Sequence, residues 1–138
     1  MWRMAVAGSV CLCVLRPVPS PQASSLIEHD STVATAQPGP HDGGGVTTAY
    51  SFFARAPNLQ LVFRKRALHR GAAIGYHHQD VDEIYYILSG TGELTLNGQR
   101  SMVGPGTAVL TRPGSSHGLR QVGSDDLVLI IAYQQARR

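Results

Sequence analysis

Cysteine is scarce in this chain and is confined to its first residues. The two cysteines, Cys11 and Cys13, both lie inside an apolar run over residues 4–15. If this run is removed, the remaining chain has no thiol, which excludes disulfides, cysteine nucleophiles and cysteine metal ligands. Any metal site would then depend on nitrogen and oxygen donors.

Clustered positive charge is also lacking. The formal net charge is +3 at pH 7, and loss of Arg3 and Arg16 with the N-terminal run would lower it to about +1. A nucleic-acid-binding surface needs clustered lysine and arginine, but the only local cluster lies at residues 64–66, with Arg70 nearby. We interpret this cluster as a solvated edge strand, the alternative being that it attracts an acidic substrate to a barrel mouth. The sequence therefore predicts no nucleic-acid partner.

The N-terminal region has the parts of a secretory signal peptide. Arg3 gives a positive start, residues 4–15 are apolar, and residues 17–24 are rich in proline and small side chains. This pattern predicts a signal peptide over residues 1–23, too short to span a membrane. The protein would be secreted or periplasmic, with no membrane contact after processing. If translation instead begins further along the chain, the signal peptide is absent and the protein would be cytoplasmic.

Residues 24–47 have a different composition. Pro38, Pro40 and the glycines at 43–45 lie among polar side chains. Such a segment buries too little apolar surface to order itself, so we expect a flexible N-terminal segment. His29 and His41 fall within it, and we expect both to be solvated.

No stretch after residue 48 has a helical period. Short β-prone runs recur instead, separated by turn signals such as Asn97-Gly98, which predicts a tight hairpin. This pattern predicts an all-β barrel or sandwich in a single domain over residues 48–138. The runs cover residues 49–55, 59–68, 76–79, 83–88, 93–96, 99–103, 107–111, 117–122 and 127–133.

Residues 71–90 hold the side chains most suited to binding a metal ion. Because alternate residues of a strand share a face, His77 and Gln79 are expected to point one way and His78 the other. Residues 80–82 can form a turn, after which Glu83 returns to face His77. A β-bulge at residues 76–79 would instead turn His78 inward.

The spacing of these residues resembles the first motif of cupins. In that family the motif is Gly, five residues, His-x-His, three or four residues, Glu, six residues, Gly. Here Gly71, His77, Glu83 and Gly90 fall on its positions, and Gln79 stands where the second His is usual.

The second cupin motif is matched over residues 106–121 with two departures. Arg112 replaces the usual Pro, Gln121 replaces the usual Asn, and His117 falls on the expected His. The resemblance covers roughly the last ninety residues. It implies a double-stranded β-helix, or jelly-roll, barrel with a metal site made by His77, Gln79, Glu83 and His117.

Two imidazoles, a carboxylate and an amide oxygen suit Fe, Mn or Zn as divalent ions. Gln79 is the weakest donor, so it either lowers metal affinity or holds a water instead. A barrel without metal is the alternative. Strand parity adds Tyr85 and Gln121 as substrate-pocket candidates, and Arg112 joins them because its guanidinium can bind a carboxylate or phosphate. No catalytic residue is assigned.

Two classes of function fit these features. The first is a metal-dependent enzyme of dioxygenase, isomerase or hydrolase type acting on a small polar or anionic molecule. The second is a non-catalytic barrel that binds a sugar or another small ligand. The fold alone does not decide between them. Ile84, Tyr86 and Leu88 point away from the pocket face and need a cover, and the resemblance favours a homodimer.

Overall fold

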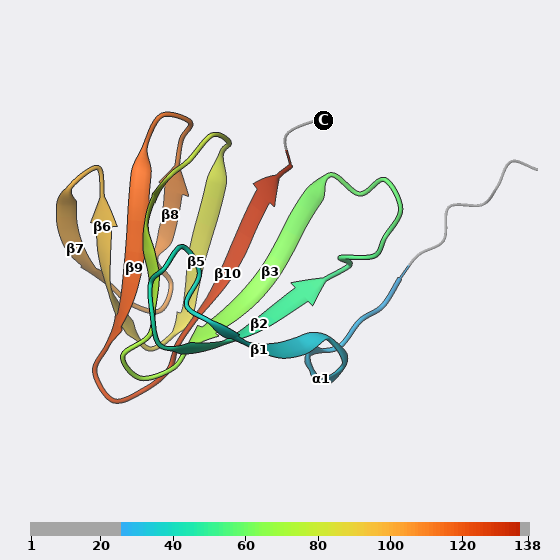
Figure 1. The fold of residues 1–138 in the computed structure, drawn as a ribbon, viewed down its shortest axis with the longest axis horizontal. Coiled ribbons are helices and arrows are strands. Elements are labelled where there is room, and N and C mark those ends of the chain that lie inside the picture. The colour runs from blue at the N-terminus through green and yellow to red at the C-terminus, as the bar shows by residue number, and fades with distance from the viewer. Residues whose placement is uncertain (1–25, 136–138) are drawn as a thin grey trace, which may run out of the picture.

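The computed structural model describes residues 26–135, so the expected signal peptide lies outside the described residues. Within residues 26–135 no helix is long and apolar enough to span a membrane. The described chain forms one short helix and ten strands (Figure 1): α1 (Asp30–Val33), β1 (Ala34–Pro38), β2 (Val46–Phe52), β3 (Leu61–Leu68), β4 (Ala73–His78), β5 (Glu83–Ser89), β6 (Thr91–Leu96), β7 (Gln99–Val103), β8 (Ala108–Thr111), β9 (Ser116–Val122) and β10 (Leu127–Gln134).

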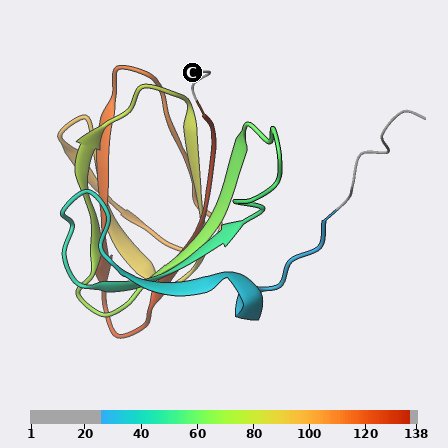
Figure 2. The same ribbon diagram turned by 45° about the vertical axis from the view of Figure 1, so that its right-hand side comes forward.

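The strands form two antiparallel sheets that face each other. One has the order β1-β2-β3-β10-β5-β8 and the other β4-β9-β6-β7. Figure 2 shows them as opposite walls of a barrel. The expected all-β jelly-roll fold is thus confirmed. Asn97 and Gly98, both with positive φ, form the predicted turn between β6 and β7.

The core lies between the sheets because each strand alternates buried and exposed residues. In β5, Glu83, Tyr85 and Ile87 are buried, whereas the residues between them are exposed. This alternation is the period of two expected for a strand with one face toward a core. The largest fully buried apolar side chains are Leu68, Ile87, Leu119, Leu127 and Leu129.

Strand β3 is not an edge strand, which corrects the interpretation of residues 64–66. It pairs with β2 on one side and β10 on the other. Lys65 points outward and pairs with Asp30, whereas Arg66 points into the barrel and is only 5% exposed. The run of charges at residues 64–66 suggested that all three side chains are solvated, but strand parity places that of Arg66 inside the barrel.

The N-terminal segment differs from the flexible linker that we expected. Residues 34–38 pair with β2 along their whole length, and the carboxylate of Glu28 accepts a hydrogen bond from the backbone N–H of Phe53 at 2.6 Å. All five residues of β1 are exposed. The strand is therefore held by its backbone, and composition alone gives no sign of that.

The loop over residues 39–45 covers the free edge of β4. The N–H of Gly75 donates to the carbonyl of Pro40 at 2.9 Å, and the N–H of Ala73 donates to that of Gly44 at 3.2 Å. A Cβ on Gly75 would overlap the carbonyl oxygen of His41. The glycines that suggested flexibility therefore allow a close backbone approach that protects a sheet edge.

A β-bulge interrupts β4 ahead of His77. Ile74 pairs with Leu119 and His77 pairs with His117, so Gly75 and Tyr76 together oppose the single residue Gly118. The extra residue reverses the alternation, which places Ile74 and His77 on the same, inner face. The bulge therefore lies just before His77. The alternative bulge at residues 76–79, which would turn His78 inward, is not the one observed.

Candidate metal centre

Three side chains converge inside the barrel from three strands. His77 lies near the end of β4, Glu83 begins β5, and His117 lies in β9 opposite His77. One ligand atom from each residue lies within 4.8 Å of the others. Glu83 is 6% exposed and His117 is fully buried. The geometry therefore collects two imidazoles and one carboxylate at a site shielded from water.

The ring of His77 is oriented by its own strand. Its Nδ1 lies 2.8 Å from the carbonyl oxygen of Gly75, one of the two bulge residues. A carbonyl can only accept, so Nδ1 carries the proton and donates. The lone pair of neutral His77 is then on Nε2, which is the form that binds a metal. The bulge both turns His77 inward and sets its tautomer.

His117 has a corresponding support. Its Nδ1 lies 2.8 Å from the hydroxyl oxygen of Thr111, which is 1% exposed. The hydroxyl can accept a proton from Nδ1, and in that tautomer the lone pair is on Nε2, 3.0 Å from Oε2 of Glu83. Thr111 is a residue that sequence reasoning missed, although its inward parity in β8 is a usable signal.

The carboxylate of Glu83 gives the strongest indication that the site binds a cation. Its Oε2 lies 3.0 Å from Nε2 of His117, but the two are not aligned as a hydrogen bond, and no other group of residues 26–135 donates to this buried oxygen. Two donors on adjacent octahedral positions with bonds near 2.1 Å are about 3 Å apart. A shared divalent ion therefore fits both the spacing and the unsatisfied oxygen.

Tyr85 lies beside the three donors. Its ring stacks on that of His117 with centroids 4.8 Å apart, and its hydroxyl oxygen is 3.5 Å from Nε2 of His117. Burial, reinforced by the negative charge of Glu83, raises the pKa of Tyr85 well above its ordinary value. Tyr85 therefore remains a neutral phenol that can donate a hydrogen bond.

His41 also lies beside this site, although it keeps the solvent exposure that we expected. Its ring lies parallel to that of His77, with centroids 3.5 Å apart. Burial, followed by the proximity of His77, lowers the pKa of His41 below its ordinary value, so the ring is neutral at pH 7. No local sequence signal links His41 to His77, because the loop that carries it docks through backbone groups.

Gln79 and His78 lie on opposite sides at the end of β4. Gln79 is half-buried, and its backbone bonds with the 114–115 turn. Among the described residues no hydrogen bond engages its side-chain amide. The His78 side chain is 58% exposed, with Nε2 3.6 Å from the carboxylate of Asp80, so His78 lies outside the group of three donors.

Two of the predicted pocket residues have other contacts. Nε of Arg112 forms an ion pair with Asp82 at 2.8 Å, and the Arg112 side chain is 69% exposed. The amide of Gln121 accepts from the N–H of Gly71 at 2.8 Å and donates to the carbonyl of Asp125 at 2.7 Å. Gln121 thus ties two loops together. Neither residue lines the cavity beside the metal centre.

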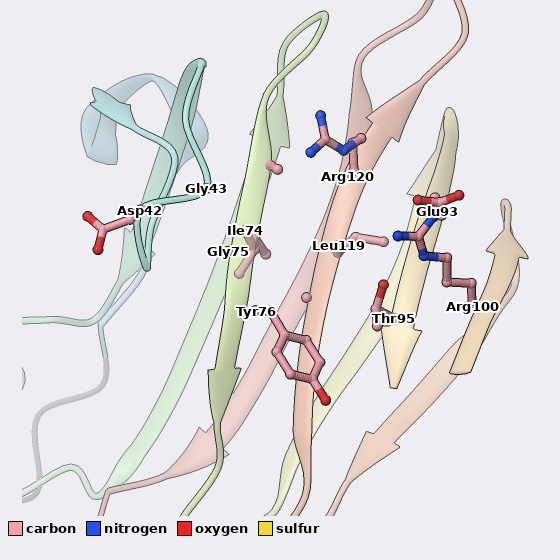
Figure 3. Close-up of a pocket in the computed structure, with 12 residues that line it drawn as sticks. Asp42, Gly43, Ile74, Gly75, Tyr76, Glu93, Thr95, Arg100, Leu119 and Arg120 are labelled. Atoms are coloured by element: carbon pink, nitrogen blue, oxygen red, sulfur yellow. The ribbon is translucent and has the colours of Figure 1, made fainter. Parts of the chain in front are cut away.

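That cavity is small, about 70 Å³, and its walls include Glu83 and Tyr85. A larger groove of about 240 Å³ lies elsewhere, on the outer face of the four-stranded sheet. Figure 3 shows Tyr76, Thr95 and Arg120 around it. We take the small cavity as the functional one because Glu83, one of the three donors, and the neighbouring Tyr85 border it.

Comparison with known proteins agrees with this architecture. Residues 66–133 match the Cupin domain family. An oxalate-binding protein from Thermotoga maritima is 35% identical over 71 residues, which are 51% of this chain and 59% of that protein. The match thus spans less than two thirds of that relative.

Solved structures show the same fold. A predicted oxalate decarboxylase from Thermotoga maritima has a TM-score of 0.73 at 24% identity, over 80% of this chain and 100% of that one. A polyketide cyclase from Streptomyces resistomycificus has a TM-score of 0.67 at 20% identity, over 83% and 82% of the two chains. At these identities the likeness concerns the fold alone.

Proposed function

Because this chain belongs to the cupin superfamily, we propose that it binds one divalent metal ion through His77, Glu83 and His117 and holds a small anionic molecule at that ion. The observation that carries this proposal is the buried carboxylate oxygen of Glu83, which has no hydrogen-bond donor among residues 26–135. The neutral ring of His77 is held with its Nε2 lone pair available, and Nε2 of His117 lies 3.0 Å from the same oxygen.

The donor set favours Fe, Mn or Zn over softer metals, because it contains nitrogen and oxygen donors and no sulfur. Gln79 is the proposed fourth ligand. Its half-buried position just beyond His77 supports this role, and its neutral amide would bind more weakly than an imidazole. The ion would supply a positive charge that binds and polarises an oxygen of the ligand.

The chemistry of the cavity supports an anionic ligand. A divalent ion held by one carboxylate keeps a net positive charge, and the neutral phenol of Tyr85 can donate to a ligand oxygen. The relative from Thermotoga maritima is described as oxalate-binding, so oxalate is the first ligand to test. Sugar binding, the non-catalytic alternative, is less suited to a cavity of about 70 Å³.

Turnover is the second candidate function, and Tyr85 favours it. A buried phenol 3.5 Å from Nε2 of a proposed metal ligand, His117, is placed to hold or deliver a proton. Dioxygenase, isomerase or hydrolase chemistry on a small acid would each use such a group.

We also propose a homodimer and export. The outer face of the six-stranded sheet exposes Ile84, Tyr86, Leu88 and Leu110, and a second copy of the chain would cover these side chains. Export follows only from the sequence of residues 1–23.

The test is metal analysis of protein purified without chelator or nickel. One equivalent of Fe, Mn or Zn is expected, followed by calorimetric binding of oxalate in preference to glucose. Carbon dioxide release and oxygen uptake then separate turnover from binding. Protein that takes up no metal even after reconstitution would contradict the proposal.

A further inference from the structure

Arg66 places a guanidinium inside the barrel, away from water. The residue is 5% exposed, and its neighbours on the flanking strands are Ala49 and Leu129. Burial lowers the pKa of Arg66 below its ordinary value, but an arginine keeps its charge in proteins. A buried cation is costly unless an anion pairs with it.

No anion of the described chain pairs with Arg66. Its Nη1 donates to the hydroxyl of Thr47 at 2.8 Å, and its Nη2 donates to the amide oxygen of Gln37 at 3.4 Å. Both partners are neutral. The ion pairs formed within residues 26–135 do not include Arg66. The guanidinium thus has a fixed position and further N–H groups available to a ligand.

Arg66 borders the same small cavity as the metal centre. The walls of this cavity include Arg64, Arg66, Glu83 and Tyr85, and its volume is about 70 Å³. Arg64 is two residues before Arg66, on the same face of β3, with Cζ 5.8 Å from the ring centroid of Tyr133. Two arginine residues therefore border the same cavity as Glu83, the carboxylate of the proposed metal centre.

We propose that Arg66, assisted by Arg64, is the second anchoring point for the ligand, and that the ligand is a short dicarboxylate. This inference rests on the proposed function, in which the metal ion holds the first carboxylate. A guanidinium offers a planar pair of donors that matches a second carboxylate. The small volume of the cavity, about 70 Å³, favours a short acid over a bulkier ligand.

The test compares a dianion with a monoanion in metal-loaded protein. Calorimetry with oxalate and acetate at equal ionic strength is applied to the wild type, Arg66→Met, Arg64→Gln and Arg120→Gln. Arg120 is the matched control because it lies on the outer face of the other sheet (Figure 3). Loss of a buried charged hydrogen bond predicts roughly 30-fold weaker oxalate binding in Arg66→Met and less than about threefold weaker acetate binding. Arg120→Gln should leave both affinities within about twofold.

A second measurement separates ligand recognition from a structural role. Because Arg66 is a buried cation without a counterion, Arg66→Met should leave the Tm of the ligand-free protein unchanged or higher, and its metal content should match the wild type. If Arg66→Met fails to fold, the half-buried Arg64→Gln carries the test, with loss of oxalate preference as the expected result.

The experiment distinguishes failure of the proposed function from failure of the second anchoring point. Wild-type protein that holds no metal contradicts the proposed function. Wild-type protein that holds metal, while Arg66→Met and Arg64→Gln keep the full preference for oxalate over acetate, overturns only the assignment of the second anchoring point.

Discussion

The imidazole of His41 lies flat on the imidazole of His77, with centroids 3.5 Å apart and ring planes 5° apart. The two residues come from distant parts of the chain. His41 lies in the loop between β1 and β2 with a φ of 54°, and His77 is a proposed metal ligand in β4. The contact covers one face of the ligand ring and limits its rotation.

Removing this stack should loosen the metal. His41→Ala is expected to speed metal release to a chelator roughly tenfold, because stacked ring pairs contribute about 0.5–1.5 kcal/mol. His41→Phe should retain most of the wild-type rate because it keeps a flat ring. Stopped-flow release with a colorimetric chelator measures both. Equal rates in all three proteins would show that the stack has no effect on the ion.

Thr111→Val tests the support of His117. Valine has nearly the same shape but no hydroxyl, so the imidazole loses its hydrogen-bond partner at Nδ1. Metal affinity should fall roughly 10-fold to 100-fold, the usual effect of removing a hydrogen-bond partner of a metal-bound histidine. Competition titration against a chelator gives the ratio. Thr111→Ser, which keeps the hydroxyl, should restore most of the affinity.

The proposed ligands differ in how much each should matter. Glu83→Ala or His77→Ala should abolish stoichiometric metal binding, whereas Gln79→His should strengthen it by replacing an amide oxygen with an imidazole. His78→Ala should have little effect because its side chain is 58% exposed. Metal content and Kd are measured in one buffer. Loss of metal in His78→Ala together with its retention in Gln79→Ala would contradict the assignment.

Gly75→Ala tests the docking of the N-terminal loop. A Cβ at this position would overlap the carbonyl oxygen of His41, so the loop must move away from β4. We expect the free energy of unfolding to fall by about 1–3 kcal/mol, as for other overpacked sites. Gly104→Ala is the matched control, since nothing lies within 4 Å of a Cβ there. Urea denaturation of both variants gives the comparison, and equal loss in both would rule out a specific effect of the loop.

The proposed dimer is tested on the outer face of the six-stranded sheet. Tyr86→Lys combined with Ile84→Lys should give a monomer, because two charges would replace side chains that a second copy covers. Met102→Lys changes an exposed apolar residue in β7 of the other sheet and should leave the dimer intact. Sedimentation equilibrium measures the mass. A wild-type monomer across micromolar concentrations would refute the dimer outright.

Much of the barrel could be predicted because the relevant signals are local. Alternation in residues 83–88 gives the inward face of β5, and Asn97-Gly98 gives the turn that joins β6 and β7. The motif spacing predicted that His77, Glu83 and His117 lie close together, and the structure places them so. Strand parity suggested a pocket role for Gln121, and the donor geometry of a guanidinium suggested one for Arg112, but the side chains contact loop backbone and Asp82, respectively.

The remaining features depend on contacts between distant segments. His41 reaches His77 because backbone groups of the loop bond to β4, and no side-chain pattern records those bonds. Arg66 is buried because β3 acquires neighbours on both sides, whereas a run of three cations predicts an exposed strand. Composition gave no sign of β1 for the same reason, since residues 34–38 are ordered without burying any side chain.

The free edge of β4 determines where this protein can be shortened. A gene trimmed to residue 48, or to residue 66 where the family match begins, would remove the carbonyl groups of Pro40 and Gly44 that accept from β4. The exposed N–H groups would then be open to strands of neighbouring molecules, a common origin of domain-swapped and aggregated products. The smallest fragment that keeps the edge closed and the helix with its N-cap begins at His29, well ahead of the family match.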